Sequence, residues 1–173
     1  FPKLLLIGEP TSCQAGVAQK GCIWLKLSVS GKTSHGAEPW QGINALEQGF
    51  GLLADLREEL MREEHPVLGR STLQVTMAEG GIAPNMTPDR AQFLADIRIV
   101  PPLNEKEVLN RLECLIEKRC EVYNGGLSFT PEISNYRMPV ETGPKNQWLH
   151  RLKGFIGDNA GETGINYLDR KSV

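Results

Sequence analysis

The sequence predicts an α+β domain in which a four-stranded antiparallel sheet carries two helices on one face. Alternating apolar and polar residues indicate strands, and apolar residues spaced three and four apart indicate helices. Along the middle of the 173-residue chain these signals follow the order strand, helix, strand, strand, helix, strand. That order is the split βαβ, or ferredoxin-like, pattern. We place this domain at residues 14–133 and expect the second face of its sheet to meet solvent or a partner.

The composition excludes several other classes of protein. A hydrophobic content of 40% suffices for a core, and a net charge of −2 leaves no basic footprint for nucleic acid or an acidic membrane. No apolar run reaches the length of a membrane span, and no secretion signal is present. The four cysteines (Cys13, Cys22, Cys114 and Cys120) form no CxxC pair, so a zinc knuckle is not expected. We expect free thiols and a cytoplasmic location.

Both ends look like flanking pieces of a second domain. The apolar run at residues 3–8 fits a strand buried in a parallel sheet, and the carboxyl ends of such strands are where ligands and metals gather. Glu9 stands at that end and is a candidate metal ligand, with a solvated loop carboxylate as the alternative. Because the chain begins with Phe and its last residues give no stop signal, we expect a piece cut from a longer protein.

The first strand and helix of the domain follow a connection of small residues at 14–21. Residues 22–30 alternate over their second half, with Leu25, Leu27 and Val29 on one face. From Asn44 to Glu64 the apolar residues form one helical stripe. His65 and Pro66 end the helix, and we expect His65 to be exposed or to cap the helix end.

One histidine lies between that strand and that helix, in a run of small residues. Gly31 and Gly36 on either side of His35 allow backbone angles that other residues resist, and Pro39 fixes the chain before the helix. His35 is therefore expected on a shaped loop at a strand-to-helix junction, a common place for a functional residue. The alternative is a surface histidine on an ordinary connection.

The second half of the domain repeats the strand and helix signals. Strands are predicted at residues 71–77, 91–100 and 127–133, and a turn-rich loop at residues 78–89. In the middle strand of these, Asp96 and Arg98 face away from the apolar side. Asn104 is the predicted N-cap of a helix running to Cys120.

Beyond residue 133 the signals are weaker. Residues 134–145 are predicted to be irregular and residues 146–156 to form a short helix with His150 solvated. The tail from Gly157 is expected to be poorly ordered.

Three local patterns together resemble one family of enzymes. They are Gly8-Glu9-Pro10-Thr11 after an apolar strand, the stretch 29–45 around His35, and Gly80-Gly81 followed by Asn85, Pro88, Asp89 and Asp96-Ile97-Arg98. In this order and spacing they resemble the metal-dependent amidohydrolases that include succinyl-diaminopimelate desuccinylase, acetylornithine deacetylase, aminoacylase and glutamate carboxypeptidase. The resemblance covers residues 4–133 well and the remainder loosely.

The resemblance implies a division of labour between two domains. Such enzymes have an α/β catalytic domain with two metals, usually zinc, and an inserted ferredoxin-like lid that dimerises. The chain would then be that lid (14–133), with residues 1–13 ending the first catalytic segment and residues 134–173 beginning the second.

Four residues match functional positions of that family. Glu9 matches a metal ligand, and His35 matches the lid histidine that reaches the active site of the opposite subunit to stabilise the oxyanion. Asn85 and Arg98 match positions that hold the carboxylate of the substrate, which the Arg fork suits. Two alternatives stay open: Asn85 could cap its own turn, and Arg98 could pair with Asp96 or Asp89.

The resemblance also implies what the chain lacks. The other metal ligands and the general base of the family find no match in residues 1–173, so we expect no bound metal and no catalysis by the chain alone. N-acyl amino acids and small peptides both remain open as substrates. The alternative function is a non-catalytic regulatory or dimerisation module of ferredoxin-like fold.

Overall fold

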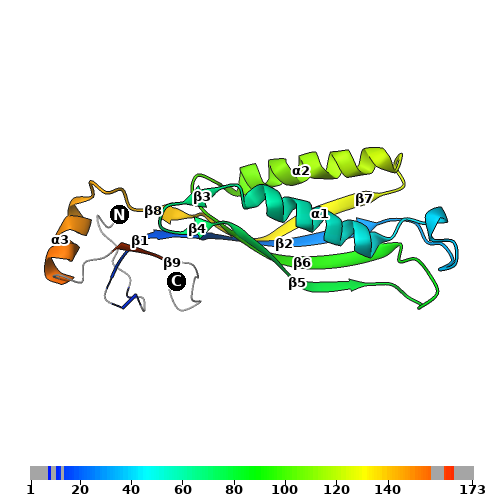
Figure 1. Cartoon of the computed structure of the whole chain (residues 1–173), viewed down its shortest axis with the longest axis horizontal. Coiled ribbons are helices and arrows are strands. Elements are labelled where there is room, and N and C mark those ends of the chain that lie inside the picture. The colour runs from blue at the N-terminus through cyan, green and yellow to red at the C-terminus, as the bar shows by residue number, and fades with distance from the viewer. Residues whose placement is uncertain (1–7, 9–10, 13, 157–161, 166–173) are drawn as a thin grey trace.

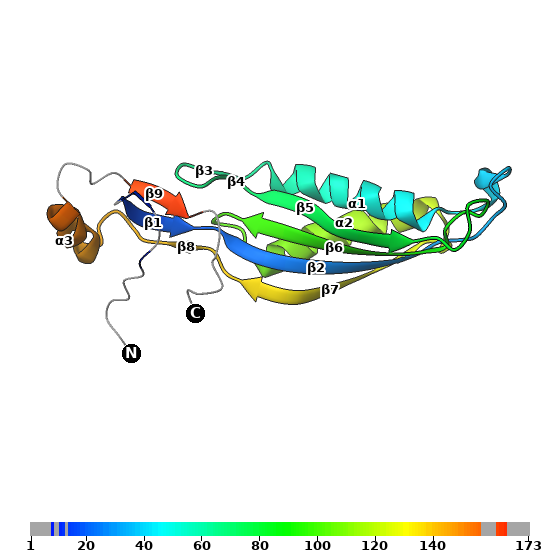
Figure 2. The ribbon, with the colours of Figure 1, turned by 90° about the horizontal axis from the view of Figure 1, so that it is seen from below.

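The structure of the chain, a computed structural model, describes residues 8, 11–12, 14–156 and 162–165. Its largest part is an antiparallel sheet in the order β5-β6-β2-β7. Helices α1 and α2 lie on one face of this sheet and not on the other (Figure 1, Figure 2). The bounds are Gly21–Ser30 for β2, Ala45–Leu60 for α1, Thr72–Gly80 for β5, Arg90–Ile99 for β6, Glu105–Val122 for α2 and Ser128–Arg137 for β7. The predicted ferredoxin-like fold is confirmed.

The core is the layer between this sheet and its two helices. Every second residue of β2 and β6 faces it, as the alternation predicted, and α1 packs against it with Gly49 buried. A Cβ atom at Gly49 would collide with the ring of Phe93 in β6. Glycine within a helix costs about 1 kcal/mol relative to alanine. Here it allows the helix to lie directly on an aromatic ring.

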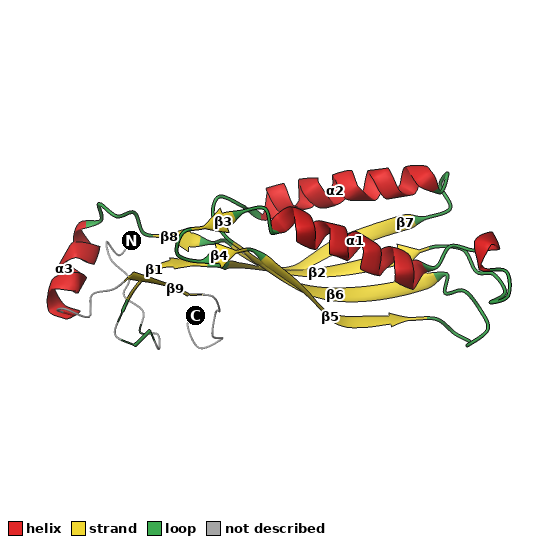
Figure 3. Cartoon of the chain, in the orientation of Figure 1, coloured by secondary structure: helices red, strands yellow, loops and turns green. Residues whose placement is uncertain are grey.

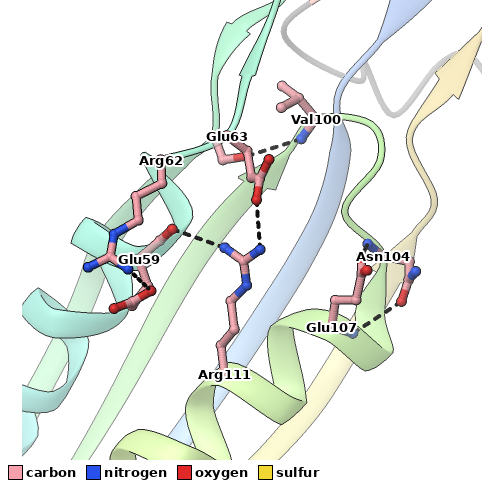
Figure 4. A network of polar contacts seen from close by, with 8 residues as sticks. Glu59, Arg62, Glu63, Val100, Asn104, Glu107 and Arg111 are labelled. Carbon is pink, nitrogen blue, oxygen red and sulfur yellow. Dashed lines mark hydrogen bonds and ion pairs between the residues drawn. The ribbon is translucent and has the colours of Figure 1, made fainter.

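Polar contacts set the ends of the two helices. The side chain of Asn44 accepts hydrogen bonds at the start of α1, and Asn104 forms a capping box with Glu107 at the start of α2, as predicted for Asn104. Arg111 of α2 donates to the carbonyl oxygen of Glu59 at 3.0 Å and pairs with Glu63 at 2.7 Å (Figure 4). Arg111 thereby satisfies a carbonyl group in the last turn of α1, which ends at Leu60 rather than at the predicted residue 64.

A smaller sheet lies at one end of the molecule (Figure 3). Its middle strand, β1 (Ala15–Gln19), pairs antiparallel with β8 (Val140–Glu141) and parallel with β9 (Glu162–Ile165). Helix α3 (Gln147–Ile156) packs on β1 through Leu149. The predictions of a connection at 14–21, an irregular segment at 134–145 and a poorly ordered tail are therefore wrong at these three strands. Strands this short carry too few alternations to be recognised, and their partners lie far away in sequence.

A hairpin of β3 (Glu64–His65) and β4 (Gly69–Arg70) reaches from the end of α1 to the small sheet (Figure 2). Its turn residue Leu68 packs against Ala18 of β1 and Val100 after β6. Lys20, which follows β1, donates from Nζ to the carbonyl oxygen of Arg70 at 2.6 Å, and burial lowers its pKa. The hairpin therefore fastens the two sheets to each other.

His65 is part of this hairpin, so the expectation that it is exposed or caps the helix is wrong. Only 6% of the residue is exposed. Its Nδ1 accepts hydrogen bonds from the N–H groups of Val67 and Leu68, both at 3.2 Å. Its Nε2 lies 3.3 Å from a carboxylate oxygen of Glu141 in β8. The ring is occupied on both nitrogens by structural contacts.

The described part of the chain also contains three of the four cysteines. Cys22, Cys114 and Cys120 are free thiols, as predicted, whereas Cys13 and Glu9 lie outside the described residues. The predicted strand at residues 3–8 also lies outside them apart from Gly8. No described helix is both long and apolar enough to cross a membrane.

Candidate functional site

Two loops meet at the end of the large sheet that is remote from the small sheet (Figure 1). Residues 31–44 follow β2, and residues 81–89 connect β5 to β6. The pairing of β2 with β6 runs from Gly21 opposite Ile99 to Ser30 opposite Arg90. The antiparallel register therefore brings the loop that leaves β2 beside the loop that enters β6.

Hydrogen bonds join the two loops along their length. The hydroxyl groups of Ser34 and Thr87 lie 2.8 Å apart. Four backbone N–H groups donate across the junction: Gly31 to Asp89 at 2.7 Å, Gly36 to Asn85 at 2.8 Å, Thr87 to Ser34 at 2.9 Å and Ala45 to Pro88 at 2.8 Å. A Cβ atom at Gly36 would lie only 3.2 Å from the carbonyl oxygen of Asn85, so a side chain there would push the loops apart. The loops form one connected unit.

His35 is exposed on this unit, at the strand-to-helix junction where it was predicted. Its Nδ1 accepts a hydrogen bond from the N–H group of Ala37 at 3.1 Å. With Nδ1 acting as acceptor, a neutral imidazole carries its proton on Nε2. The loop therefore holds the ring so that Nε2–H can donate to a group outside the domain.

Asn85 lies on the facing loop, so the structure brings these two predicted site residues together. The backbone carbonyl of Asn85 is used by Gly36, and position 86 forms a bridge with His35. Its side-chain amide is exposed and has no hydrogen-bond partner within the described ranges. The amide does not cap its own turn, which removes the structural alternative for that side chain.

Large apolar side chains are exposed on the same unit. Trp40, in the short 3-10 helix Pro39–Gln41, is 76% exposed, and Ile82 is 83% exposed. Exposed apolar side chains gathered around a polar group are typical of a surface that contacts another protein or a ligand. The tip of the molecule around His35 is therefore a candidate contact surface for another protein or a ligand.

Arg98, the third predicted site residue in the described part, lies elsewhere. It is on the uncovered face of the sheet, where its Nε and Nη2 donate to the two oxygens of Asp96 at 2.6 and 2.9 Å. Trp24 of β2 donates from its indole N–H to the same carboxylate at 3.2 Å. The hydrogen bonds to Asp96 raise the pKa of Arg98. Asp96 and Asp89 were the two candidate partners of Arg98, and in the structure Arg98 pairs with Asp96.

The structure separates Arg98 from His35. Arg98 is opposite Cys22, whereas the loop of His35 begins after Ser30, opposite Arg90. Eight residues separate these rows along the strand, which is about 26 Å at roughly 3.3 Å per residue. Within one chain the two side chains cannot contact the same small substrate.

Two residues near Arg98 escaped the sequence reasoning. Arg137 lies at the end of β7, in a segment predicted to be irregular, and Trp24 was not assigned to a face. Both are on the uncovered face, because Arg137 is opposite Cys22 and Trp24 is opposite Asp96. Alternation within residues 22–30 could have placed Trp24 on the polar face of the strand. The face on which Arg137 lies could be recognised only from the register of β7.

The described residues do not form a metal site. No group of three or more His, Cys, Asp or Glu side chains within residues 8, 11–12, 14–156 and 162–165 could hold an ion. Glu9, the predicted ligand, is outside this part. The donor set that this part of the chain presents therefore does not fit a resident metal.

Comparison with known proteins gives one family model that matches residues 17–124, described as a peptidase dimerisation domain. An acetylornithine deacetylase from Pasteurella multocida is 30% identical over 133 residues, which cover 73% of this chain and 35% of that protein. A succinyl-diaminopimelate desuccinylase from Phenylobacterium zucineum is 28% identical over 145 residues, covering 80% of this chain and 38% of that protein. The chain spans about a third of the length of the curated relatives it matches.

Solved structures show the same fold at low identity. The crystal structure of an aminopeptidase from Bacillus cereus matches with a TM-score of 0.67 and 18% identity. The match covers 92% of this chain and 42% of the aminopeptidase.

Proposed function

The chain belongs to the peptidase dimerisation domain family, and on that premise we propose that it is the lid and dimerisation part of a metal-dependent amidohydrolase. The proposed reaction is hydrolysis of the amide bond of an N-acyl amino acid or a small peptide. The relatives at 28–30% identity are hydrolases of this kind by name. The observation that carries the proposal is His35, exposed with a free Nε2 on a loop that is joined to the loop of Asn85.

His35 supplies a hydrogen bond to the oxygen of the scissile carbonyl. When a nucleophile attacks the carbonyl carbon, negative charge develops on that oxygen, and a preorganised N–H donor stabilises it. The hydrogen bond from Ala37 to Nδ1 supports the tautomer that this role needs. Asn85, with its unpaired amide, contributes a second polar contact to the bound substrate.

His35 and Arg98 serve different active sites in this proposal. Their separation along the sheet supports an arrangement in which His35 reaches the active site of the partner subunit and Arg98 serves its own. The Arg98 guanidinium uses Nε and Nη2 on Asp96, which leaves Nη1 to bind a substrate carboxylate. The exposed Trp40 and Ile82 support insertion of the His35 tip into the partner.

The metals belong to other residues of a longer protein. We propose two divalent metal ions, zinc in the first instance, with Glu9 as one ligand and the remaining ligands outside this chain. Such ions supply Lewis acidity and an activated water. The chain alone is then inactive. The cytoplasmic location remains a prediction from the sequence.

The reaction is tested by measuring amine release from N-acetyl and N-succinyl amino acids and from dipeptides. The longer protein is expected to release amine from at least one of these classes, and the 173-residue chain from none. If the longer protein hydrolyses no member of the panel, the amidohydrolase assignment is wrong. A non-catalytic regulatory or dimerisation module would then be the better description.

The dimer is proposed to form along the edge of β5. The other edge strand, β7, contains Pro131, which has no N–H group for pairing. Near the start of β5, Arg57 donates to the carbonyl oxygen of Leu73 at 2.9 Å, whereas residues 76–80 are exposed. Met77 in this stretch is 64% exposed. An unpaired, partly apolar strand edge favours pairing with a second copy.

Replacing Met77 with glutamate is expected to weaken the dimer at least about tenfold, which is ~1.4 kcal/mol. The substitution would introduce a charge into the pairing edge of each subunit, and apolar contact would be lost. Sedimentation equilibrium of the 173-residue chain measures the dissociation constant. Val122→Glu, at a 73% exposed apolar position at the end of α2, is the matched control and should leave the dimer unchanged. Dissociation by Val122→Glu instead of Met77→Glu would place the interface elsewhere.

A further inference from the structure

We propose that the uncovered face of the large sheet binds a small molecule with two carboxylate groups, held between the guanidinium groups of Arg98 and Arg137. The inference deepens the proposed function and rests on it for identifying this ligand as the substrate. It adds Arg137 as a residue that determines specificity. It also narrows the substrate class to N-acyl amino acids or peptides with an acidic group in addition to the main carboxylate.

The strand register places the two arginines on either side of one residue. Cys22 of β2 is opposite Arg98 of β6 and also opposite Arg137 of β7. Residues directly opposite one another on neighbouring strands point to the same face of a sheet. With neighbouring strands about 4.8 Å apart, the Cα atoms of the two arginines are roughly 10 Å apart. Both side chains therefore rise from the uncovered face with a short side chain between them.

Cys22 lies between the two arginines in the strand register. Its thiol is buried, and burial raises its pKa, while the charges of Arg98 and Arg137 act in the opposite direction. The amide nitrogen of Asn135 lies 3.9 Å from its sulfur atom. The small thiol thus forms the floor between two cationic groups.

The two arginines are not equally engaged. Asp96 takes two of the five N–H groups of Arg98 and is itself held by the indole of Trp24. Arg137 has no carboxylate within ion-pair distance among the residues that the structure describes. The side chains of Arg98, Arg137 and Asp96 together carry a net charge of +1, and both guanidinium groups retain N–H donors for an anion. Arg98 has an anionic partner in Asp96, and the second carboxylate of a ligand would supply one for Arg137.

A dicarboxylate of small size fits these features better than an extended polyanion. The next cation on this face, Lys26, already has Glu132 at 3.9 Å, so the positive charge does not continue as a stripe along the sheet. Nucleic acids are bound by extended basic surfaces, and the whole chain carries a net charge of −2. Trp24 is 40% exposed beside the arginines and offers an apolar contact to the carbon chain between the carboxylates.

Binding can be measured directly on the 173-residue chain. The indole N–H resonance of Trp24 in ¹H–¹⁵N NMR spectra reports on the site, and it is titrated with succinate, glutarate and acetate at constant ionic strength. We expect one of the dicarboxylates to bind at least about tenfold more tightly than acetate, a difference of ~1.4 kcal/mol. Arg137→Gln should remove this preference. Lys26→Gln, a cation on the same face, should leave it unchanged.

Two results would overturn the inference. One is equal binding of acetate and both dicarboxylates. The other is a preference for dicarboxylates that does not depend specifically on Arg137. It would survive Arg137→Gln, or it would be lost equally in Lys26→Gln through general charge attraction. Backbone chemical shifts of the variants verify that the sheet is intact.

A second measurement separates this inference from the proposed function. In the longer protein, kcat/KM is compared for matched N-acyl glutamate and N-acyl glutamine substrates. Arg137→Gln should remove the preference for glutamate mainly through KM, whereas His35→Ala should lower turnover of both substrates by the same factor. A normal His35 effect without a glutamate preference would refute the dicarboxylate site and leave the proposed function standing. Dicarboxylate binding that depends on Arg137, together with unchanged turnover in His35→Ala, would refute the proposed function instead.

Discussion

Replacing His35 with alanine is expected to lower kcat of the longer protein by about 10²–10³-fold, the effect of losing one oxyanion donor. The hydrogen bond from Ala37 to Nδ1 holds the ring so that Nε2–H can donate to the developing negative charge. Because this contact strengthens only in the transition state, kcat and kcat/KM should fall together. Steady-state kinetics with the best substrate of the panel measures both.

The control for this variant is another exposed histidine of the same chain. His150→Ala, on α3 and without a role in the proposal, should keep wild-type turnover. The metal content of His35→Ala should also match that of the wild type, since His35 is not a proposed ligand. Unchanged turnover of His35→Ala would remove the catalytic role of this residue.

Mixed dimers test whether His35 acts across subunits. One subunit carries His35→Ala, and the other carries an inactivated metal site. If His35 acts in the partner, the first subunit receives an intact histidine and keeps one working active site per dimer. If His35 acts within its own subunit, the mixed dimer has none. Activity of the purified mixed species therefore decides between the two arrangements.

Removing metal from the longer protein is expected to reduce turnover to background, and adding zinc should restore it. The proposed chemistry depends on the Lewis acidity and activated water that bound metal supplies. The same treatment should leave the dissociation constant of the dimer unchanged. No cluster of His, Cys, Asp or Glu suited to a metal exists in the described part of this chain, including the β5 edge.

Two readouts check this expectation. Activity is followed during dialysis against a chelator and after addition of zinc, and sedimentation equilibrium is run on the same samples. Retained activity in the metal-free protein would rule out a metal-dependent reaction. Dissociation of the dimer on metal removal would mean that metal contributes to the interface, contrary to the β5 proposal.

The sequence predicted most of the large sheet because its signals are local and repeated. Residues 22–30 and 91–100 are long enough for alternation to be read, and Asn104 precedes its helix with the residues of a capping box. The loop position of His35 followed from the glycines and proline around it. Residues that act through neighbours in sequence were thus predictable.

The failures share a physical cause, which is dependence on distant partners. β1 and β8 are short strands that pair across more than a hundred residues of sequence. Strands of two to five residues show too little alternation to reveal such a pairing. His65 was expected to be exposed or to cap the helix, because cations are favoured near a helix C-terminus. The β3–β4 hairpin instead folds back on β1 and places the imidazole of His65 against Glu141 of β8.

For the candidate site, the sequence alone determined which residue types stand on which strands and loops. It placed His35 and Asn85 on turn-rich loops and Arg98 on a polar strand face, because backbone propensity and alternation depend on adjacent residues. The tertiary structure alone decided which of them meet. The register of β2 with β6 joins the loops of His35 and Asn85 and sets Arg98 about 26 Å from the row where the His35 loop begins. The register of β2 with β7 places Arg137 on the same face as Arg98, with Cys22 between them. Register depends on contacts between residues far apart in the chain, so it becomes visible only when the strands are paired.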